Sequence, residues 1–257
     1  MIFNDTDHQM WQKLYKKQIH RLKDVVNPVF LDNLKKFKLP IDRVPTLNEI
    51  SEKMYAAAGW RATPVNGLIG YDRYFSLLKD RLFPTAMFMR QGGEEDLSKD
   101  PDFFHEVFGH CTMLLSMEYA NFMHEYAKFA LTADIVDRPL FARLIWFTTE
   151  TALLRVNGVL KIYGSSIISS YTESFYCLNS NEPVFKSFNV VDIFREPYRA
   201  DLLQKVYYIL DNVNQLYNLL DNTGKLYQQL KKARELGEFP AAFTAEHSKY
   251  ANIGHCK

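Results

Sequence analysis

The chain has 257 residues, of which 47% are hydrophobic and 24% are charged, a balance typical of a globular protein with one large domain. Its 31 basic and 30 acidic residues leave a formal net charge of +1, so no basic field indicates a nucleic-acid partner or an anionic membrane. No stretch reaches the roughly 20 apolar residues of a membrane span, and the first residues lack the pattern of a signal peptide. The three cysteines are scattered, which favours a reducing cytoplasm.

The first third of the chain is predicted to be mostly helical. From the N-terminus we expect one or two helices over 7–37, a helix from Thr46 to about Ala58, an irregular segment over 59–67, a helix over 71–81 and a short strand over 85–90. The start at Thr46 is the clearest of these signals, because Thr46-Leu-Asn-Glu49 is a capping box.

The rest of the chain continues the helical pattern. After a polar loop, Asp100 and Pro101 are expected to start a helix, with the aspartate as the cap and the proline in the first turn. We then expect helix to about Ala133, a helix over 137–156, a β segment over 159–162, a helix over 165–177, short strands within 179–198, and helices over 201–220 and 225–236. The prediction is a mostly α-helical single domain of packed helices with a few short β-strands.

His105 and His110 form an unusual pair within an apolar segment. Five residues advance about 500° on a regular helix, which leaves the two rings about 140° apart. The zinc-protease motif His-Glu-x-x-His instead places its histidines four residues apart on one face. Both rings can therefore bind one metal only if residues 104–110 depart from an ideal helix, and Gly109 would tolerate such a distortion.

Glu150 is the candidate third ligand. It is a lone carboxylate in an apolar stretch over 144–154, and a buried charge is costly unless it is paired, protonated or bound to a metal. An ion pair with Arg143 or Arg155 would also account for it. Together with the two histidines, however, it completes a possible 2-His-1-carboxylate triad, which leaves one face of an octahedral metal open.

The ligand types alone leave three functions open. Such a triad suits non-haem Fe(II) in oxygen chemistry, whereas a zinc hydrolase uses the same residue types and would take Glu106 as its general base. The five-residue spacing disfavours the hydrolase. The third possibility is a non-catalytic helical interaction protein in which His105 and Glu150 are polar core residues.

Five blocks of the sequence, taken in order, carry a family resemblance. The blocks are Arg61-Ala-Thr-Pro-Val-Asn-Gly-Leu68, Phe83-Pro84 with Phe88-Met-Arg90, Pro101-Asp-Phe-Phe-His-Glu-Val-Phe-Gly-His110, Trp146-Phe-Thr-Thr-Glu150, and Tyr163-Gly164 with Ile168-Ser-Ser-Tyr-Thr-Glu173. Over roughly residues 45–215 the chain resembles the tetrahydropterin-dependent aromatic amino acid hydroxylases. The proline at position 84 resembles the pattern of the bacterial phenylalanine 4-monooxygenases more than that of the animal enzymes. The resemblance implies a catalytic domain that uses Fe(II), a tetrahydropterin and O2 to hydroxylate a free aromatic amino acid. L-phenylalanine, converted to L-tyrosine, is the expected substrate, with tryptophan or tyrosine as the alternative.

The resemblance also implies roles for individual side chains. The implied iron ligands are His105, His110 and Glu150. The implied substrate-binding residues are Arg90, Ser98, Trp146 and Ser169. The implied pterin-binding residues are Gly67, Leu68, Ile69, Tyr74 and Glu106. The planar guanidinium of Arg90 suits two-point contact with the α-carboxylate of the substrate. For two of the others, simpler roles stay open: Ser169 is also compatible with a serine on a helix surface, and Trp146 with an ordinary aromatic residue of the core.

Some positions depart from the family pattern. Ser166 stands where many relatives have glycine, Thr151 follows the ligand glutamate where animal relatives have phenylalanine, and Ala200 is smaller than usual. These differences leave the substrate open. Residues 1–257 are expected to form one catalytic domain without a regulatory domain. The tail lacks sustained heptads, so we expect a monomer that binds an aromatic amino acid, O2 and reduced pterin, with no nucleic acid or membrane partner.

Overall fold

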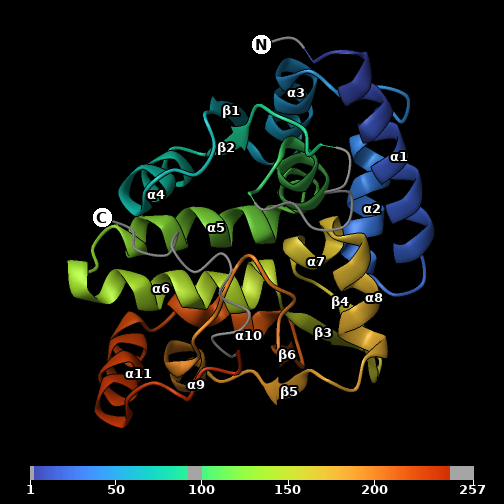
Figure 1. The fold of residues 1–257 in the computed structure, drawn as a ribbon. Coiled ribbons are helices and arrows are strands. Elements are labelled where there is room, and N and C mark those ends of the chain that lie inside the picture. Colours follow the sequence, from blue (N-terminus) through green and yellow to red (C-terminus); the bar gives the residue numbers. More distant parts are fainter. Residues whose placement is uncertain (1–2, 92–99, 244–257) are drawn as a thin grey trace.

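Helices supply most of the regular structure in the computed structural model, which describes residues 3–91 and 100–243 (Figure 1). The α-helices are α1 (Asp5–Leu22), α2 (Pro28–Phe37), α3 (Leu47–Ala58), α4 (Tyr71–Lys79), α5 (Met117–Ala130), α6 (Arg138–Ile145), α7 (Ser165–Ser169), α8 (Tyr171–Asn179), α9 (Val190–Arg195), α10 (Asn214–Tyr217) and α11 (Thr223–Leu236). Two π-helices, η1 (His105–Cys111) and η3 (Trp146–Glu150), and two short 3-10 helices, η2 (Ile135–Asp137) and η4 (Asn218–Leu220), complete the helical set. The expected mostly α-helical fold is confirmed.

Two small sheets lie among the helices in the described part of the chain. β1 (Arg61–Val65) pairs in parallel with β2 (Leu82–Ala86). A four-stranded sheet has the order β4-β3-β6-β5, formed by β3 (Leu153–Val156), β4 (Val159–Ile162), β5 (Val184–Ser187) and β6 (Val206–Leu210). β3 and β4 form an antiparallel hairpin. Its turn residues Asn157 and Gly158 both have positive φ, 50° and 80°, as a tight hairpin turn requires.

Capping side chains explain where the first helices begin. Thr46 and Glu49 form the expected capping box, because each side chain accepts a hydrogen bond from the other residue's backbone N–H. Asn27 caps α2, and Pro28 occupies the first turn of that helix. The predicted segment over 7–37 is therefore two helices, with the break at the asparagine and proline.

Aromatic rings pack η1 against α1 and α2. Phe104 and Phe108 stack with their ring centroids 4.7 Å apart. Trp11 contacts the first ring at 5.4 Å, and Tyr15 and Phe30 contact the second at 5.4 and 5.5 Å. Because such buried ring pairs are held by both apolar burial and edge-to-face geometry, the cluster fixes the position of the segment that carries the two histidines.

The later strands are the largest departure from the predicted elements. Residues 201–220 were expected to be helical, but β6 occupies their centre, and every residue of this strand is buried. A short apolar run of this kind cannot be distinguished from a buried helix by its periodicity. The helix expected over 137–156 ends at Glu150 and is followed by β3. Conversely, the range 179–198 contains the helix α9 as well as the strand β5.

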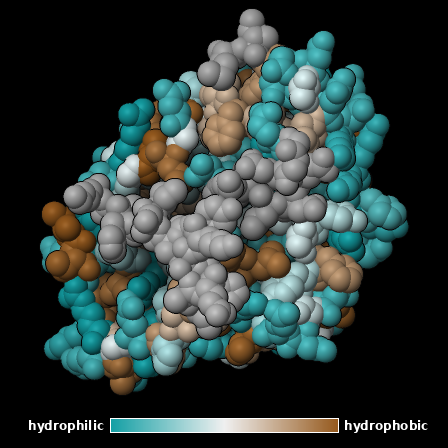
Figure 2. Space-filling view, in the orientation of Figure 1, coloured by the Kyte–Doolittle hydropathy of each residue, from teal (hydrophilic) through white to brown (hydrophobic). Residues whose placement is uncertain are grey.

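The first sheet was also missed in part. Residues 59–67 were expected to be irregular, but they contain β1, and the strand expected over 85–90 lies earlier, as β2. No helix in the described part of the chain is long and apolar enough to cross a membrane. On the face seen in Figure 2, hydrophobic side chains form separate groups among hydrophilic ones.

Candidate metal centre

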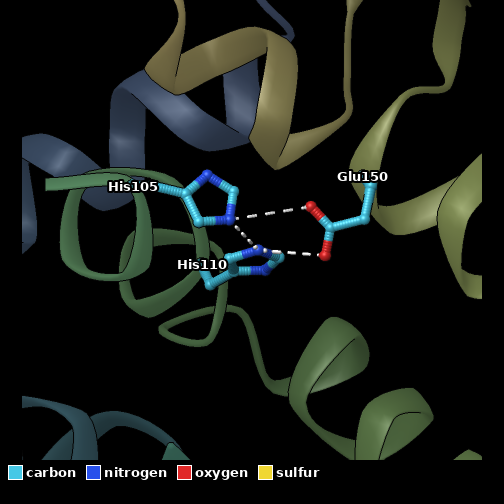
Figure 3. Close-up of side chains that lie close together, drawn as sticks. All are labelled: His105, His110 and Glu150. Carbon is cyan, nitrogen blue, oxygen red and sulfur yellow. Dashed lines mark hydrogen bonds and ion pairs between the residues drawn. The ribbon is translucent and has the colours of Figure 1, made fainter. Parts of the chain in front are cut away.

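Two histidine side chains from η1 and a glutamate side chain from η3, 40 residues further along the chain, meet at one point (Figure 3). His110 Nε2 lies 3.1 Å from His105 Nε2 and 3.1 Å from Glu150 Oε1. His105 Nε2 lies 3.9 Å from Glu150 Oε2. One ligand atom from each residue can be chosen so that all lie within 4.8 Å of one another. The structure therefore brings the three predicted ligands to one point.

The π-helical backbone explains how histidines five residues apart share one site. In a π-helix the backbone hydrogen bonds join residues five apart, and in an α-helix they join residues four apart. The side chains of residues i and i+5 therefore lie closer to the same face of a π-helix than they would on an α-helix. The π-helix η1 begins at His105 and includes His110, and η3 ends at Glu150. The expected departure from an ideal helix over 104–110 is confirmed.

Two glycines allow α7 to approach both π-helices closely. A Cβ on Gly109 would lie 2.9 Å from the carbonyl oxygen of Ser165, and a Cβ on Gly164 would lie 2.2 Å from the carbonyl oxygen of Glu150. Gly109 is not among the glycines with positive φ in the described residues. Its role is therefore close packing, and not the tolerance of an unusual backbone angle that the sequence suggested.

Serine hydroxyls from α7 contact two of the three ligands. Ser169 Oγ lies 2.8 Å from His105 Nδ1 and donates to the carbonyl oxygen of Ser166 at 3.2 Å. Because that hydroxyl hydrogen is used, Nδ1–H of His105 is the donor to Ser169, which leaves Nε2 free to bind a metal. Ser166 Oγ donates to Glu150 Oε2 at 2.8 Å.

Burial and mutual charge set the protonation of the site. Burial, assisted by the charge of His110, lowers the pKa of His105 to about 4. Burial opposes ionisation of Glu150, but the charge and hydrogen bond of His110 outweigh it and lower the pKa of Glu150 to about 2. Burial also opposes the charge on His110, yet Glu150 raises its pKa overall. A metal must displace the His110 proton, so metal affinity is expected to fall as the pH falls.

The donor set fits a divalent transition metal. With metal–ligand bonds of about 2.1 Å, neighbouring ligands of an octahedral ion lie about 3.0 Å apart. The two separations that involve His110 Nε2 are both 3.1 Å. Two imidazoles and one carboxylate are also the ligand types of the non-haem iron triad.

Arg90 is held in a buried ion pair with Asp102. Its Nε and Nη2 donate to the two carboxylate oxygens at 2.9 and 2.7 Å. Asp102 Oδ1 also accepts from the backbone N–H of His105 at 3.0 Å. The expected cap at Asp100 is therefore wrong, because the acceptor at the start of this helix is Asp102. The Asp102 carboxylate therefore accepts hydrogen bonds both from the Arg90 guanidinium and from the backbone of the predicted metal ligand His105.

Trp146 is fixed by the loop that precedes β6. Its Nε1–H donates to Gln204 Oε1 at 3.0 Å, and its ring stacks on Tyr198 with centroids 4.7 Å apart. The Gln204 amide donates to the carbonyl oxygens of Arg199 and Leu202, both at 2.8 Å. The indole therefore has a defined orientation on the same π-helix that carries the carboxylate ligand.

The other predicted site residues occupy several elements. Gly67, Leu68 and Ile69 lie in the loop between β1 and α4, and Leu68 is exposed. Burial raises the pKa of the Tyr74 phenol, and the charges of Glu150 and Glu106 add to the rise. Burial likewise raises the pKa of Glu106 to about 8, against the opposing charge of His110. These two side chains thus share the electrostatic surroundings of the three ligands. Ser98 lies outside the described residues.

Glu173, on α8, is another buried carboxyl group. Its Oε1 accepts hydrogen bonds from the Tyr207 hydroxyl at 2.8 Å and from the Gln204 backbone N–H at 3.3 Å. Burial dominates and raises the pKa of Glu173 from 4.5 to about 7. Because the folded state then holds this proton more tightly than the unfolded chain, the contribution to stability is present at low pH and is lost as the pH rises through about 7.

We expect the variant Glu173→Gln to remove this pH dependence. The stability of the wild-type protein relative to the variant should fall by about 2 kcal/mol between about pH 5 and about pH 8. Urea unfolding of both proteins across this range measures the difference. A constant difference would contradict a raised pKa at this position.

Two contacting residues, Gln204 and Asp102, were not singled out from the sequence, and Ser166 was noted only as a departure from the family pattern. Ser166 and Gln204 reach their partners only through the tertiary fold, so no local signal indicates these contacts. Asp102 had such a signal, because it stands three residues before His105, the spacing at which an aspartate accepts from a helical backbone N–H.

Known proteins are similar to this chain in both sequence and fold. Residues 1–236 match the family model described as biopterin-dependent aromatic amino acid hydroxylase. The phenylalanine-4-hydroxylase of Vibrio cholerae is 39% identical over 211 residues, which cover 82% of this chain and 73% of that protein. The solved phenylalanine hydroxylase of Legionella pneumophila gives a TM-score of 0.89 at 38% identity, covering 95% of this chain and 96% of that one. The Chromobacterium violaceum enzyme, solved with iron(III) and 7,8-dihydrobiopterin, gives 0.87 at 34% identity, covering 95% and 87%.

Proposed function

The chain belongs to the biopterin-dependent aromatic amino acid hydroxylases, and from that premise we propose that it converts free L-phenylalanine to L-tyrosine with O2 and a tetrahydropterin. The observation that carries this proposal is the convergence of His105, His110 and Glu150 in a chain that is 39% and 38% identical to the phenylalanine hydroxylases of Vibrio cholerae and Legionella pneumophila. When bound, iron and reduced pterin supply the activation of O2. The family match does not favour the alternative of a zinc hydrolase.

The protein's own residues are proposed to position the reactants. The three ligands lie to one side of the metal position and leave the other side for exchangeable ligands. Asp102 occupies the Nε and Nη2 edge of Arg90, so Nη1 is the part of the guanidinium not used by this ion pair and is suited to the substrate carboxylate. Trp146, whose orientation is fixed by Gln204, is proposed to form one wall of the pocket for the substrate ring. Ser169 contacts His105, and its role toward the substrate stays a prediction, as do those of Ser98 and the five pterin residues.

A product assay tests the function directly. Protein reconstituted anaerobically with Fe(II) would be given reduced pterin, O2 and, separately, phenylalanine, tyrosine or tryptophan. We expect tyrosine from phenylalanine at a higher kcat/KM than any product from the other two, and no product after removal of iron by a chelator. Preferred turnover of tryptophan or tyrosine would overturn the substrate assignment, and iron-independent hydrolysis would overturn the reaction class.

The variant Arg90→Ala is expected to raise the KM for the amino acid by at least about 10-fold, with little change in the KM for the pterin, because a charged hydrogen bond is worth about 1.5–3 kcal/mol. The variant also leaves the buried Asp102 without its cation, which destabilises the fold. The double variant Arg90→Ala/Asp102→Asn separates these effects, since it should regain stability without regaining amino acid affinity. Equal increases in both KM values would contradict the assigned role.

We also propose a monomer in a reducing cytoplasm. The described cysteines, Cys111 and Cys177, are buried and form no disulfide, which supports the compartment. Light scattering at several protein concentrations tests the oligomeric state, and a constant dimer or tetramer mass would contradict it.

A further inference from the structure

The short helix α7 carries a hydroxyl that contacts the only carboxylate of the candidate metal centre. Ser166 Oγ donates to Glu150 Oε2 at 2.8 Å. We infer that Ser166 is a positioning residue for this carboxylate: it holds Oε2, so that Oε1 is the oxygen presented to the metal. The inference rests on the proposed function, because it concerns how the protein prepares the proposed iron ligand.

The two oxygens of Glu150 have different surroundings. Oε1 lies 3.1 Å from His110 Nε2, close to the spacing of neighbouring ligands around one ion. Oε2 lies 3.9 Å from His105 Nε2 and accepts the serine hydroxyl. If a metal takes the place of the His110 proton, Oε1 is left without a hydrogen bond, whereas Oε2 keeps the one from Ser166. That hydrogen bond makes Oε2 the weaker donor to a metal and fixes the rotation of the carboxyl group.

The serine is itself held in place relative to the carboxylate. Gly164, two residues earlier, packs against the Glu150 backbone so closely that a Cβ would overlap the carbonyl group. Ser169, one turn later, donates to the Ser166 carbonyl oxygen at 3.2 Å and contacts His105. Hydroxyls at positions i and i+3 of one helix lie on the same face, so α7 orients two of the three ligands together.

This arrangement determines how many coordination positions of the metal are filled by protein atoms. If Glu150 binds through Oε1 alone, the protein supplies three donor atoms, and an octahedral ion keeps three positions for exchangeable ligands. If the hydroxyl is removed, Oε2 is free to turn toward the metal as a second donor. Ser166 therefore controls the number of open positions without touching a reactant.

The test compares Ser166→Ala with the matched variant Ser165→Ala. Ser165 is the neighbouring residue on α7, it is fully buried, and its hydroxyl makes no hydrogen bond to any of the three ligand side chains in the described residues. We expect Ser166→Ala to weaken Fe(II) affinity by about 10-fold, because the carboxyl group is no longer held in one orientation before the metal binds. The freed Oε2 should change the electron paramagnetic resonance spectrum of the anaerobic Fe(II)–nitric oxide complex. Ser165→Ala should keep the wild-type values, and Ser166→Thr, which restores a hydroxyl, should recover both. Thermal melting of the metal-free proteins checks that each variant folds.

The outcomes are distinguishable. A folded Ser166→Ala variant with the wild-type spectrum and iron affinity would overturn the positioning role while leaving the proposed function intact. Equal changes in Ser165→Ala would also overturn it, because they would show a general effect of α7 packing. A wild-type protein that binds no Fe(II) and forms no tyrosine would instead overturn the proposed function, and this inference with it.

Discussion

The variant Glu150→Ala is expected to lose stoichiometric iron and aromatic hydroxylation together. Glu150 supplies the one negative charge among the three ligands, and its Oε1 lies 3.1 Å from His110 Nε2. Loss of a residue that merely orients a ligand costs 10- to 100-fold in metal affinity or activity, so loss of the ligand itself should lower kcat/KM by more than about 100-fold. Iron analysis after anaerobic Fe(II) loading, followed by a tyrosine assay, measures both effects.

Glu173→Gln is the matched control for that experiment. It also removes a buried carboxylate, but the hydrogen-bond partners of Glu173 are Tyr207 and the backbone of Gln204, not the histidines. This variant should therefore bind one iron per chain. If Glu150→Ala retained stoichiometric iron and coupled turnover, the assignment of Glu150 as a ligand would be wrong.

The sequence was most informative where one local segment determines the structure. The capping box at Thr46 and Glu49 correctly predicted the start of α3, because both partners lie within one helical turn. The spacing of His105 and His110 correctly predicted a departure from the α-helix. Both predictions rest on residues that lie within a few positions of one another in the sequence.

Features set by distant parts of the chain were not predictable in the same way. The residues of β6 are buried on all sides, and only the neighbouring strands β3 and β5 determine that this apolar run is extended. The contact of Ser166 with Glu150 joins residues sixteen positions apart, and the contact of Gln204 with Trp146 joins residues fifty-eight positions apart. Pairings of this kind depend on how helices and strands pack, so local pattern alone does not specify them.

The variant Gly164→Ala tests how strictly that packing defines the metal centre. A Cβ at this position would lie 2.2 Å from the carbonyl oxygen of Glu150, 2.3 Å from its carbonyl carbon and 2.5 Å from the backbone nitrogen of Thr151. These are backbone atoms, which cannot rotate away as a flexible side chain can, so the ligand residue itself must move. We expect the variant to lose about 3 kcal/mol of stability or more and to bind iron at least about 10-fold more weakly, as measured by urea unfolding and Fe(II) titration.

The same substitution elsewhere should have the opposite effect on stability. Gly224 lies in the first turn of α11 without positive φ, and the nearest atom to an added Cβ would be Asn222 Oδ1 at an ordinary 3.5 Å. Because alanine reduces the freedom of the unfolded chain, Gly224→Ala should stabilise the protein by up to about 1 kcal/mol and leave iron binding unchanged. If Gly164→Ala were as stable as Gly224→Ala and bound iron normally, α7 would have room to withdraw from η3. The close contact would then not be what holds Glu150 beside the two histidines.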